Sequence, residues 1–523
     1  MPKIKPTSVL LAVLALAILP AWSAPQEKTA LNLTLDECLV RAVKHNLGVA
    51  VQVYSSEIYD LAVSASREKY LPVLSFDFAR QNLNSASYSW LDTAEKSSST
   101  YMNYDASFSQ AIPFGGSFSV SLGSNRNWAN TRFQTINPRY QSTLSFSFSQ
   151  PLLKDFGDQV SRKDILVARN NRDIAENDLK KILIDTVSSV EQAYWYLVLY
   201  NESLNVQRQS LKLAEDLLAN NRKKAQIGTL APKEVISAQA EVARLRADIL
   251  QATLQVKNQI DALKGLINLP LDQDLGDIVP IDSPGSAKRD ITLEDALAIG
   301  LRNRPDLQSS ALAIKNKELN YAYAKNQTLP ALNLNASYWS PGVSGDRILF
   351  LDGNPLSGVI LGTVPGGPSI ALQDALHFKY ENWSVKLSLT IPMSSVFSRA
   401  AQAEAKVGLN QQVALMKQTE QTAYLEIRAA VRAVQTNYER VSARRTAREL
   451  AEQKLEAEQA KLEAGMSTSF VVLSYQRDLA GARTSELQAL IDYTLSLGQL
   501  DKATGTILEK RNIKLTDAGE VVK

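Results

Sequence analysis

A plan of one helix followed by strands is written twice in this sequence, and the copies begin about 258 residues apart. One copy opens at Thr34–Glu37 and the other at Thr292–Asp295. In both, a threonine that can cap a helix precedes acidic residues suited to the first turn. Each predicted helix then runs to a Leu-Pro pair, Leu71-Pro72 or Leu329-Pro330, at the same offset. Any fold assigned to one half must therefore also suit the other.

Alternating apolar and polar residues follow each Leu-Pro pair, which predicts β-strands with one apolar and one polar face. The strands are expected at about 71–150 and 329–392, ending near Pro151 and Pro392. If such strands cross a membrane, their apolar side faces lipid. The residues assigned to that side are Phe76, Phe78, Phe146, Phe148, Leu387 and Leu389.

The first copy contains an additional segment at residues 107–120, which alternates on both sides of a turn with Pro and Gly. This pattern indicates an extra β-hairpin. The alternative is an external or periplasmic flap, and the sequence leaves both open. One chain therefore offers four to six strands.

Two very long helices are predicted, at about 162–227 and 399–464, because apolar residues recur at spacings of three, four and seven. A helix of some 65 residues would be about 100 Å long. Each stops at a glycine, Gly228 or Gly465, and a shorter helix returns to about residue 268 or 504. Each copy thus ends in a helical hairpin with a tight tip.

These elements divide the chain into a first structural repeat at 25–270, with its tip near 228, and a second at 291–505, with its tip near 465. An inter-repeat linker at 271–290 separates them, and a C-terminal tail occupies 506–523. Residues 1–24 are interpreted as a signal peptide, since lysines precede a short apolar run and small residues follow it. A short membrane anchor is the alternative.

Export restricts what the mature chain can be. After the signal, no window of about 20 residues is apolar enough for a transmembrane helix, so the protein is expected either to stay soluble or to insert as a β-barrel. The single cysteine, Cys38, lies inside the first predicted helix rather than after the apolar run. No lipobox cysteine is therefore expected, and no intrachain disulfide.

Composition argues against two classes of function. The formal charge is +3, with 57 Lys and Arg against 54 Asp and Glu, which gives no strong field for attracting nucleic acid. With two histidines, one cysteine and no phosphate loop, the chain lacks the material for a metal cluster or a nucleophilic triad. The protein is therefore not expected to be an enzyme, to hold a cofactor or metal, or to bind nucleic acid.

Four to six strands are too few to close a membrane barrel, which needs about eight. Closure would require several chains to contribute strands to one wall, which argues for an oligomer. A soluble β-sandwich is the alternative for the strands, but the length of the helices suits a cylinder of packed antiparallel coils better. The rival for the whole chain is an exported coiled-coil scaffold or adhesin without a pore.

The ordered duplication of helix start, Leu-Pro pair, strands and Gly-tipped hairpin resembles the TolC family of outer-membrane efflux proteins, over nearly the whole mature chain. The resemblance implies a mostly α fold with a membrane β-barrel portion, in which a homotrimer forms one barrel continued by a helical tunnel across the periplasm. It implies an exit duct of a tripartite efflux or type I secretion system. Such a duct passively conducts substrates supplied by an inner-membrane transporter and a periplasmic adaptor. The cargo, drugs, metal ions or proteins, stays open.

The resemblance also assigns roles to residues at the hairpin tips. Gly228 and Gly465, with their neighbours Ile227, Thr229, Ala464 and Met466, are expected to dock onto the adaptor; the alternative is that the glycines only cap helices. Candidates for a periplasmic gate are Glu234, Ser467, Val471 and Ser474; the alternative for Glu234 is a solvated charge on the helix. The last three stand where well-known members carry an Arg and two Asp, so the familiar acidic ring is missing. Lys461 or Arg477 could substitute in the gate.

Overall fold

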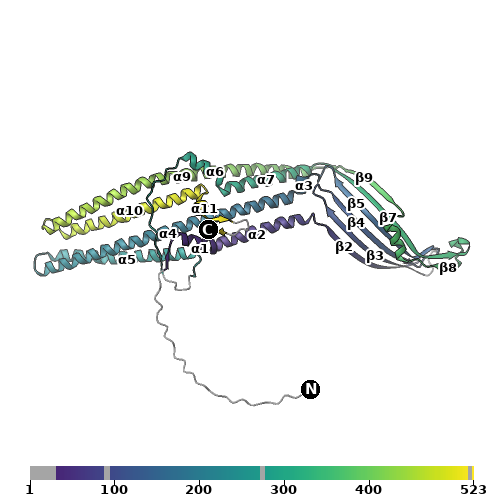
Figure 1. Cartoon of the computed structure of the whole chain (residues 1–523), viewed down its shortest axis with the longest axis horizontal. Coiled ribbons are helices and arrows are strands. Elements are labelled where there is room, and N and C mark those ends of the chain that lie inside the picture. Colours follow the sequence, from purple (N-terminus) through teal and green to yellow (C-terminus); the bar gives the residue numbers. More distant parts are fainter. Residues whose placement is uncertain (1–30, 88–94, 271–276, 516–520, 523) are drawn as a thin grey trace, which may run out of the picture.

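The computed structural model describes residues 31–87, 95–270, 277–515 and 521–522. The predicted signal peptide at 1–24 lies outside the described residues, as do residues 271–276 of the predicted linker. The molecule is long and narrow, with a β-sheet at one end and two helical hairpin tips at the other (Figure 1).

The opening helix of each copy is two helices, so the prediction of one continuous helix is wrong. The first copy has α1 (Leu35–His45) and α2 (Leu47–Glu68), and the second has α6 (Leu293–Asn303) and α7 (Pro305–Asn326). Both breaks have a local cause. The Asn46 side chain accepts hydrogen bonds from the backbone N–H groups of Gly48 and Val49, which caps a new helix. In the second copy Pro305 begins the helix and holds Arg304 in an extended conformation.

The threonine caps predicted for both copies are present. Thr34 Oγ1 accepts from the Glu37 N–H at 3.2 Å, and the Thr34 N–H donates to Glu37 Oε2 at 2.9 Å, which completes a capping box. Thr292 Oγ1 accepts from the Asp295 N–H at 3.2 Å. The matching caps explain why α1 and α6 begin at corresponding positions.

The long helices are confirmed. α4 (Lys163–Gln226) has 64 residues and follows the short α3 (Asp158–Ser161), while α9 (Val396–Glu463) has 68. Their partners α5 (Pro232–Leu266) and α10 (Ser469–Ala503) each have 35 residues, so they return along only half of the long helices. The other half is covered by the opening helices, since α2 packs on α4, and α7 packs on both α4 and α9.

Short elements at mid-length join the two copies. β1 (Leu31–Leu33) pairs in parallel with β6 (Ile278–Pro280), which lies inside the predicted linker. Tyr194 of α4 fixes this pair: its hydroxyl donates toward the Leu33 carbonyl at 3.1 Å and the Asp282 carboxylate at 2.9 Å. The chain ends near the same level with α11 (Ile507–Lys510) and the small pair β10 (Lys514–Leu515) and β11 (Val521–Val522).

The sheet is antiparallel, with strand order β2-β3-β4-β5-β7 and then β9 beside the near part of β7 and β8 beside its far part. The strands, which Figure 1 shows at the end away from the hairpin tips, are β2 (Val73–Ala86), β3 (Lys96–Ala111), β4 (Ser117–Ala129), β5 (Ile136–Pro151), β7 (Ala331–Phe350), β8 (Ile360–Val364) and β9 (Asn382–Thr390).

Of the two alternatives for residues 107–120, the extra hairpin is confirmed and the flap is wrong. β3 and β4 pair with each other, with β2 and with β5 as continuous members of the sheet. Their turn also packs where β5 leaves the sheet: the Gln150 side chain donates to the Phe114 carbonyl at 3.2 Å. Gly115 has a φ of 95°, and a Cβ there would lie 2.2 Å from the Asp155 carbonyl oxygen. The close approach requires glycine at this turn.

The strand register sorts side chains into one apolar and one polar face, because opposite residues in a sheet point to the same side. One row across the sheet reads Leu74, Phe108, Val120, Phe146, Tyr338 and Trp383. The adjacent row reads Val73 and then five serines, Ser109, Ser119, Ser147, Ser337 and Ser384.

A helix between β8 and β9, α8 (Pro368–Leu376), lies on the apolar face. A Cβ on Gly342 of β7 would lie 2.0 Å from the Ala371 carbonyl oxygen, so the helix packs directly on the strand. Just beyond α8, the Phe378 ring stacks on Phe146 with centroids 6.3 Å apart. Phe146 is therefore covered by protein, whereas the sequence alone assigned its ring to lipid. Among the described helices, none is long and apolar enough to cross a membrane.

Candidate functional site

The tip of the first hairpin, where α4 turns into α5, is closed by its own backbone. Gly228 has a φ of 77°, and the N–H groups of Gly228 and Thr229 donate to the carbonyls of Ala225 and Lys224 at 3.1 and 2.9 Å. This is the Schellman motif, in which a left-handed residue ends a helix. Pro232 then begins α5, where a missing N–H leaves no helical hydrogen bond unmade.

The tip of the second hairpin has the same geometry. Gly465 has a φ of 74°, and the N–H groups of Gly465 and Met466 donate to the carbonyls of Leu462 and Lys461 at 3.1 and 2.9 Å. A Cβ on Gly228 or Gly465 would meet nothing within 4 Å. Both positions therefore need glycine for its backbone conformation rather than for space.

Both tips present apolar side chains to solvent. Ile227 is 73% exposed and Met466 is 74% exposed, and the other four predicted tip residues, Gly228, Thr229, Ala464 and Gly465, are exposed as well. Each tip thus presents one large apolar side chain that its own hairpin does not cover.

The four predicted gate residues lie just behind the tips but do not bond to one another. Glu234 is half-buried, and its Oε2 has no hydrogen-bond partner among the described residues. Ser467 donates to Glu458 Oε1 at 2.6 Å within its own hairpin. Val471 and Ser474 are half-buried in α10. Lys461, one of the two residues expected as substitutes in the gate, bonds to Glu458 at 3.0 Å, also within the hairpin.

Two polar contacts join the hairpins behind the tips, and sequence reasoning missed both pairs. Arg477 of α10 bonds to Glu241 of α5, with 3.1 Å between Nη2 and Oε2. The Ser469 hydroxyl donates to Asn221 Oδ1 at 3.1 Å, and both residues are buried. Arg477 was suggested as a substitute in the gate, but its partner is Glu241 rather than Glu234. Nothing in a sequence pattern pairs residues 236 positions apart.

Charge and packing support the contact between Arg477 and Glu241. The hydrogen bond from Arg244 lowers the pKa of Glu241, partial burial opposes this, and Arg477 lowers it further. Next to the pair, Leu473 of α10 is buried in a cluster with Leu218 of α4 and Val242 of α5. The two hairpins are thus held together by an apolar contact with an ion pair beside it.

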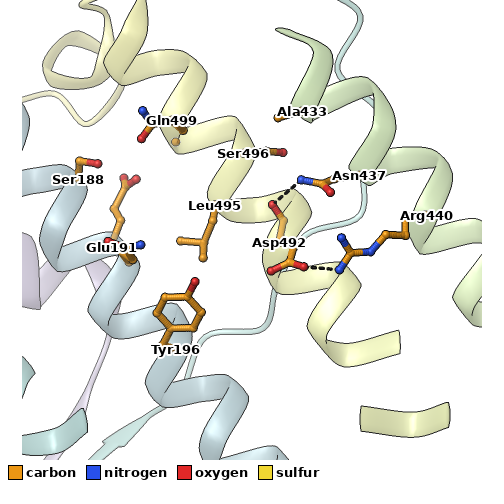
Figure 2. Close-up of a pocket in the computed structure, with 12 residues that line it drawn as sticks. Ser188, Glu191, Tyr196, Ala433, Asn437, Arg440, Asp492, Leu495, Ser496 and Gln499 are labelled. Carbon is orange, nitrogen blue, oxygen red and sulfur yellow. Dashed lines mark hydrogen bonds and ion pairs between the residues drawn. The ribbon is translucent and has the colours of Figure 1, made fainter. Parts of the chain in front are cut away.

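A cavity of about 350 Å³ lies farther along the helices, where α4, α9 and α10 meet (Figure 2). Asp492 of α10 forms an ion pair with Arg440 of α9, and the Asn437 side chain donates to the Asp492 carbonyl at 3.2 Å. On the opposite wall Glu191 is buried, and a Cβ on Gly498 would lie 2.5 Å from Glu191 Oε2. The polar walls of the cavity serve to join helices. Within the described residues, no cluster of three or more His, Cys, Asp or Glu could hold a metal ion.

At the sheet end, the predicted lipid-facing residues lie on the apolar face defined above. Phe76, Phe78, Leu387 and Leu389 are exposed on the outer strands β2 and β9, whereas Phe146 and Phe148 on β5 are half-covered. The opposite face carries hydroxyl pairs between strands, such as Ser121 with Ser145 at 2.6 Å. One side of the sheet therefore suits an apolar medium and the other suits water.

A protein-family model described as "Outer membrane efflux protein" matches residues 103–269 and 297–506. The chain belongs to the outer membrane efflux protein family. The two matched segments fall on the two hairpins and the strands before them, and the resemblance to the TolC family is confirmed. Membership of the family places the protein among outer-membrane efflux channels.

Solved channels share the fold of this efflux protein. The Campylobacter jejuni outer membrane channel CmeC superposes with a TM-score of 0.62 at 16% identity, covering 90% of this chain and 86% of that one. The open Neisseria gonorrhoeae channel MtrE gives 0.61 at 18% identity, covering 91% and 89%. The Vibrio cholerae outer membrane protein VceC gives 0.60 at 15% identity, covering 90% and 96%. No curated protein sequence matches the chain.

Proposed function

We propose that this efflux-family protein is the exit duct of a tripartite efflux or type I secretion system and conducts substrates passively. The observation that carries the proposal is a sheet with a continuous apolar face and an opposite polar face, joined to helices about 100 Å long. That combination suits a wall between lipid and water at one end and a tube at the other. The duct performs no chemistry and holds no cofactor.

The wall is completed by three copies of the chain. The described residues of one copy form six long strands beside one another, too few for a closed membrane barrel. A homotrimer closes the barrel in the outer membrane, with the apolar face toward lipid, while the helices form a tunnel in the periplasm after removal of residues 1–24 as a signal peptide. The family membership and the shared fold support this arrangement.

The exposed tips at Ile227–Thr229 and Ala464–Met466 dock onto a periplasmic adaptor, which links the duct to an inner-membrane transporter. The support is geometric: both tips have the same rigid turn, and each presents an exposed apolar side chain. Glu234, Ser467, Val471 and Ser474 line the entrance behind the tips. The ion pair between Arg477 and Glu241 holds the neighbouring hairpins in place there.

Fractionation of cells tests the location and assembly together. The protein is expected in the outer-membrane fraction as a trimer in mild detergent, and a strain without it is expected to become sensitive to toxic compounds or to lose secreted proteins. Recovery of the protein as a monomer from the soluble periplasmic fraction would contradict the proposal and favour a scaffold or adhesin.

Replacing both Ile227 and Met466 with Glu should abolish export while the trimer persists, because charge at the tips opposes an apolar contact.

A further inference from the structure

Among the described strands, β2 and β9 each leave one edge unpaired, as does the short β8 beside the far part of β7. Within the described residues, β2 pairs only with β3 and β9 pairs only with β7. Such edges are rows of unsatisfied N–H and C=O groups, which cannot face lipid. The free edges of β2 and β9 lie next to exposed apolar side chains, so a strand of another copy is the fitting partner.

The strands of the sheet are staggered in the way that a closed barrel requires. The row that starts at Val73, the first residue of β2, reaches β9 at Ser384, six residues before its last residue, Thr390. A barrel needs such stagger, because its strands tilt relative to its axis. If the last residue of β9 lies level with the first residue of β2 in the next copy, each copy contributes six residues of stagger for its six strands. Shear then equals strand number, as in closed barrels with a tilt of about 36°.

We propose that β9 of one copy pairs antiparallel with β2 of the next, with Thr390 opposite Val73, so that three copies close a barrel of eighteen strands. The inference rests on the trimeric duct proposed above. In this register each of the nine β9 residues has a partner in β2, from Asn382 with Gln81 to Thr390 with Val73.

The proposed register continues the apolar face and the polar face of the sheet across the junction, and it places opposite charges next to each other. Leu387 meets Phe76 and Leu389 meets Leu74 on the apolar face, which continues the rows of the sheet across the junction. On the polar face Lys386 stands directly opposite Asp77, and opposite charges in such pairs stabilise a sheet. A shift by two residues would place Lys386 opposite Ala79 or Ser75 and lose this pair.

The β3–β4 hairpin makes the barrel wide. Without it, each copy would supply four strands and three copies twelve. Since barrel diameter grows roughly linearly with strand number, eighteen strands give about one and a half times the diameter of twelve. Barrels of 16 to 18 strands leave an aqueous channel. The outer-membrane part therefore passes larger solutes than a twelve-stranded wall would.

Paired cysteines test the register. Ala79→Cys with Ser384→Cys places two thiols on the polar face directly opposite each other, within the Cα separation that a disulfide requires. Oxidation of the assembled protein in membranes should link copies into covalent dimers and trimers and stop at three on a non-reducing gel. The native Cys38 can stay, because it is buried and burial raises the pKa of its thiol to about 12.

The matched control is Ala79→Cys with Ser388→Cys, four residues away on the same face, which should not link copies. Ala79→Cys with Lys386→Cys reports the register shifted by two residues in which Lys386 lies opposite Ala79. Trimers that conduct but link only in a control pair, or in none, would overturn the proposed junction and leave the duct intact. A monomer outside the membrane would overturn both.

Excision of the hairpin tests the strand count. Joining Ser87 to Asn130 removes β3 and β4 and leaves β2 and β5 connected by the loop at residues 130–135. The variant should still form trimers, with a single-channel conductance reduced to about half, because area follows the square of diameter. An unchanged conductance in trimers would show that the hairpin does not widen the wall.

Discussion

The carboxylate of Glu191 in α4 lies 2.6 Å from Nε of Arg511, a residue 320 positions later that follows α11. Glu191 is almost fully buried, while about a third of the Arg511 side chain is exposed. Burial raises the pKa of Glu191, and Arg511 partly offsets this. The C-terminal segment thus neutralises a charge inside the first helical hairpin and fixes itself at the middle of the molecule.

Arg511→Met should destabilise the protein by about 3 kcal/mol at pH 7.5, since it leaves a buried carboxylate without its partner. Thermal unfolding in detergent measures this. The double variant Glu191→Gln, Arg511→Met should recover much of the loss. An Arg511→Met midpoint equal to that of the unchanged protein would contradict the role of this pair.

The pH dependence of that variant has a definite sign. A carboxyl whose pKa is raised in the folded state binds its proton more tightly when folded, so stability falls as pH rises from the ordinary pKa of 4.5 through the raised value. Without Arg511 the pKa of Glu191 rises further. Arg511→Met should therefore lose less stability at pH 5 than at pH 7.5, and an opposite trend would contradict the burial of an ionised Glu191.

Leu387→Arg should impair assembly in the membrane by about 2 to 4 kcal/mol, because it places a charge on the lipid side of β9. Ser388→Arg is the control one residue away, on the water side, and should assemble normally. The fraction of trimer in the outer membrane measures both. Equal assembly of the two variants would mean that the faces are wrongly assigned.

Arg477→Ala should open the entrance more often, since it removes the ion pair between α10 and α5. A partly exposed pair is worth up to about 1 kcal/mol, so a two- to fivefold increase in open time is expected in single-channel records. Arg483→Ala is the control, because Arg483 bonds to Glu452 within the second hairpin. A larger increase in open time from Arg483→Ala than from Arg477→Ala would contradict the role assigned to the ion pair between Arg477 and Glu241.

Acid should act like the loss of Arg477. The pKa of Glu241 is lowered, so its bonds are intact above the ordinary value of 4.5 and are lost as pH falls through the lowered pKa. Open time should therefore rise toward low pH. Glu241→Gln should already show the increased open time at neutral pH and should lack this response.

Gly228→Ala should weaken the first tip by about 1 to 2 kcal/mol, since alanine resists the left-handed conformation. Hydrogen exchange at the Thr229 amide, which closes the turn, should accelerate about tenfold. Gly408→Ala in α9 is the control: its Cβ meets nothing, and alanine favours a helix. Gly228→Asn should be milder, because asparagine tolerates this conformation.

The sequence predicted the repeating elements well because their signals are local. The caps at Thr34 and Thr292, the Gly tips and the alternation of β9 depend only on neighbours a few residues away. The break before Pro305 had a visible signal in the proline itself, whereas Asn46 could equally lie inside a helix. A proline disfavours the helical conformation of the residue before it, so its effect can be seen in the sequence. An asparagine side chain only offers the backbone an alternative hydrogen bond, so its effect depends on the surrounding structure.

Contacts between distant segments could not be predicted from the sequence. Arg477 with Glu241 and Glu191 with Arg511 depend on how helices rotate and align over tens of ångströms, which apolar periodicity fixes only coarsely. Phe378 over Phe146 depends on a helix that crosses the sheet. The glycine turns at the two hairpin tips could thus be predicted from local signals, while the residues that join the hairpins behind the tips could not.

Reconstitution of the purified protein into planar bilayers tests the exit duct most directly. Discrete, ion-conducting steps from a trimer are predicted, with a conductance larger than that of the variant in which Ser87 is joined to Asn130. Trimers that insert into bilayers and carry no current, both as purified and with Arg477→Ala to release the entrance, would contradict the duct.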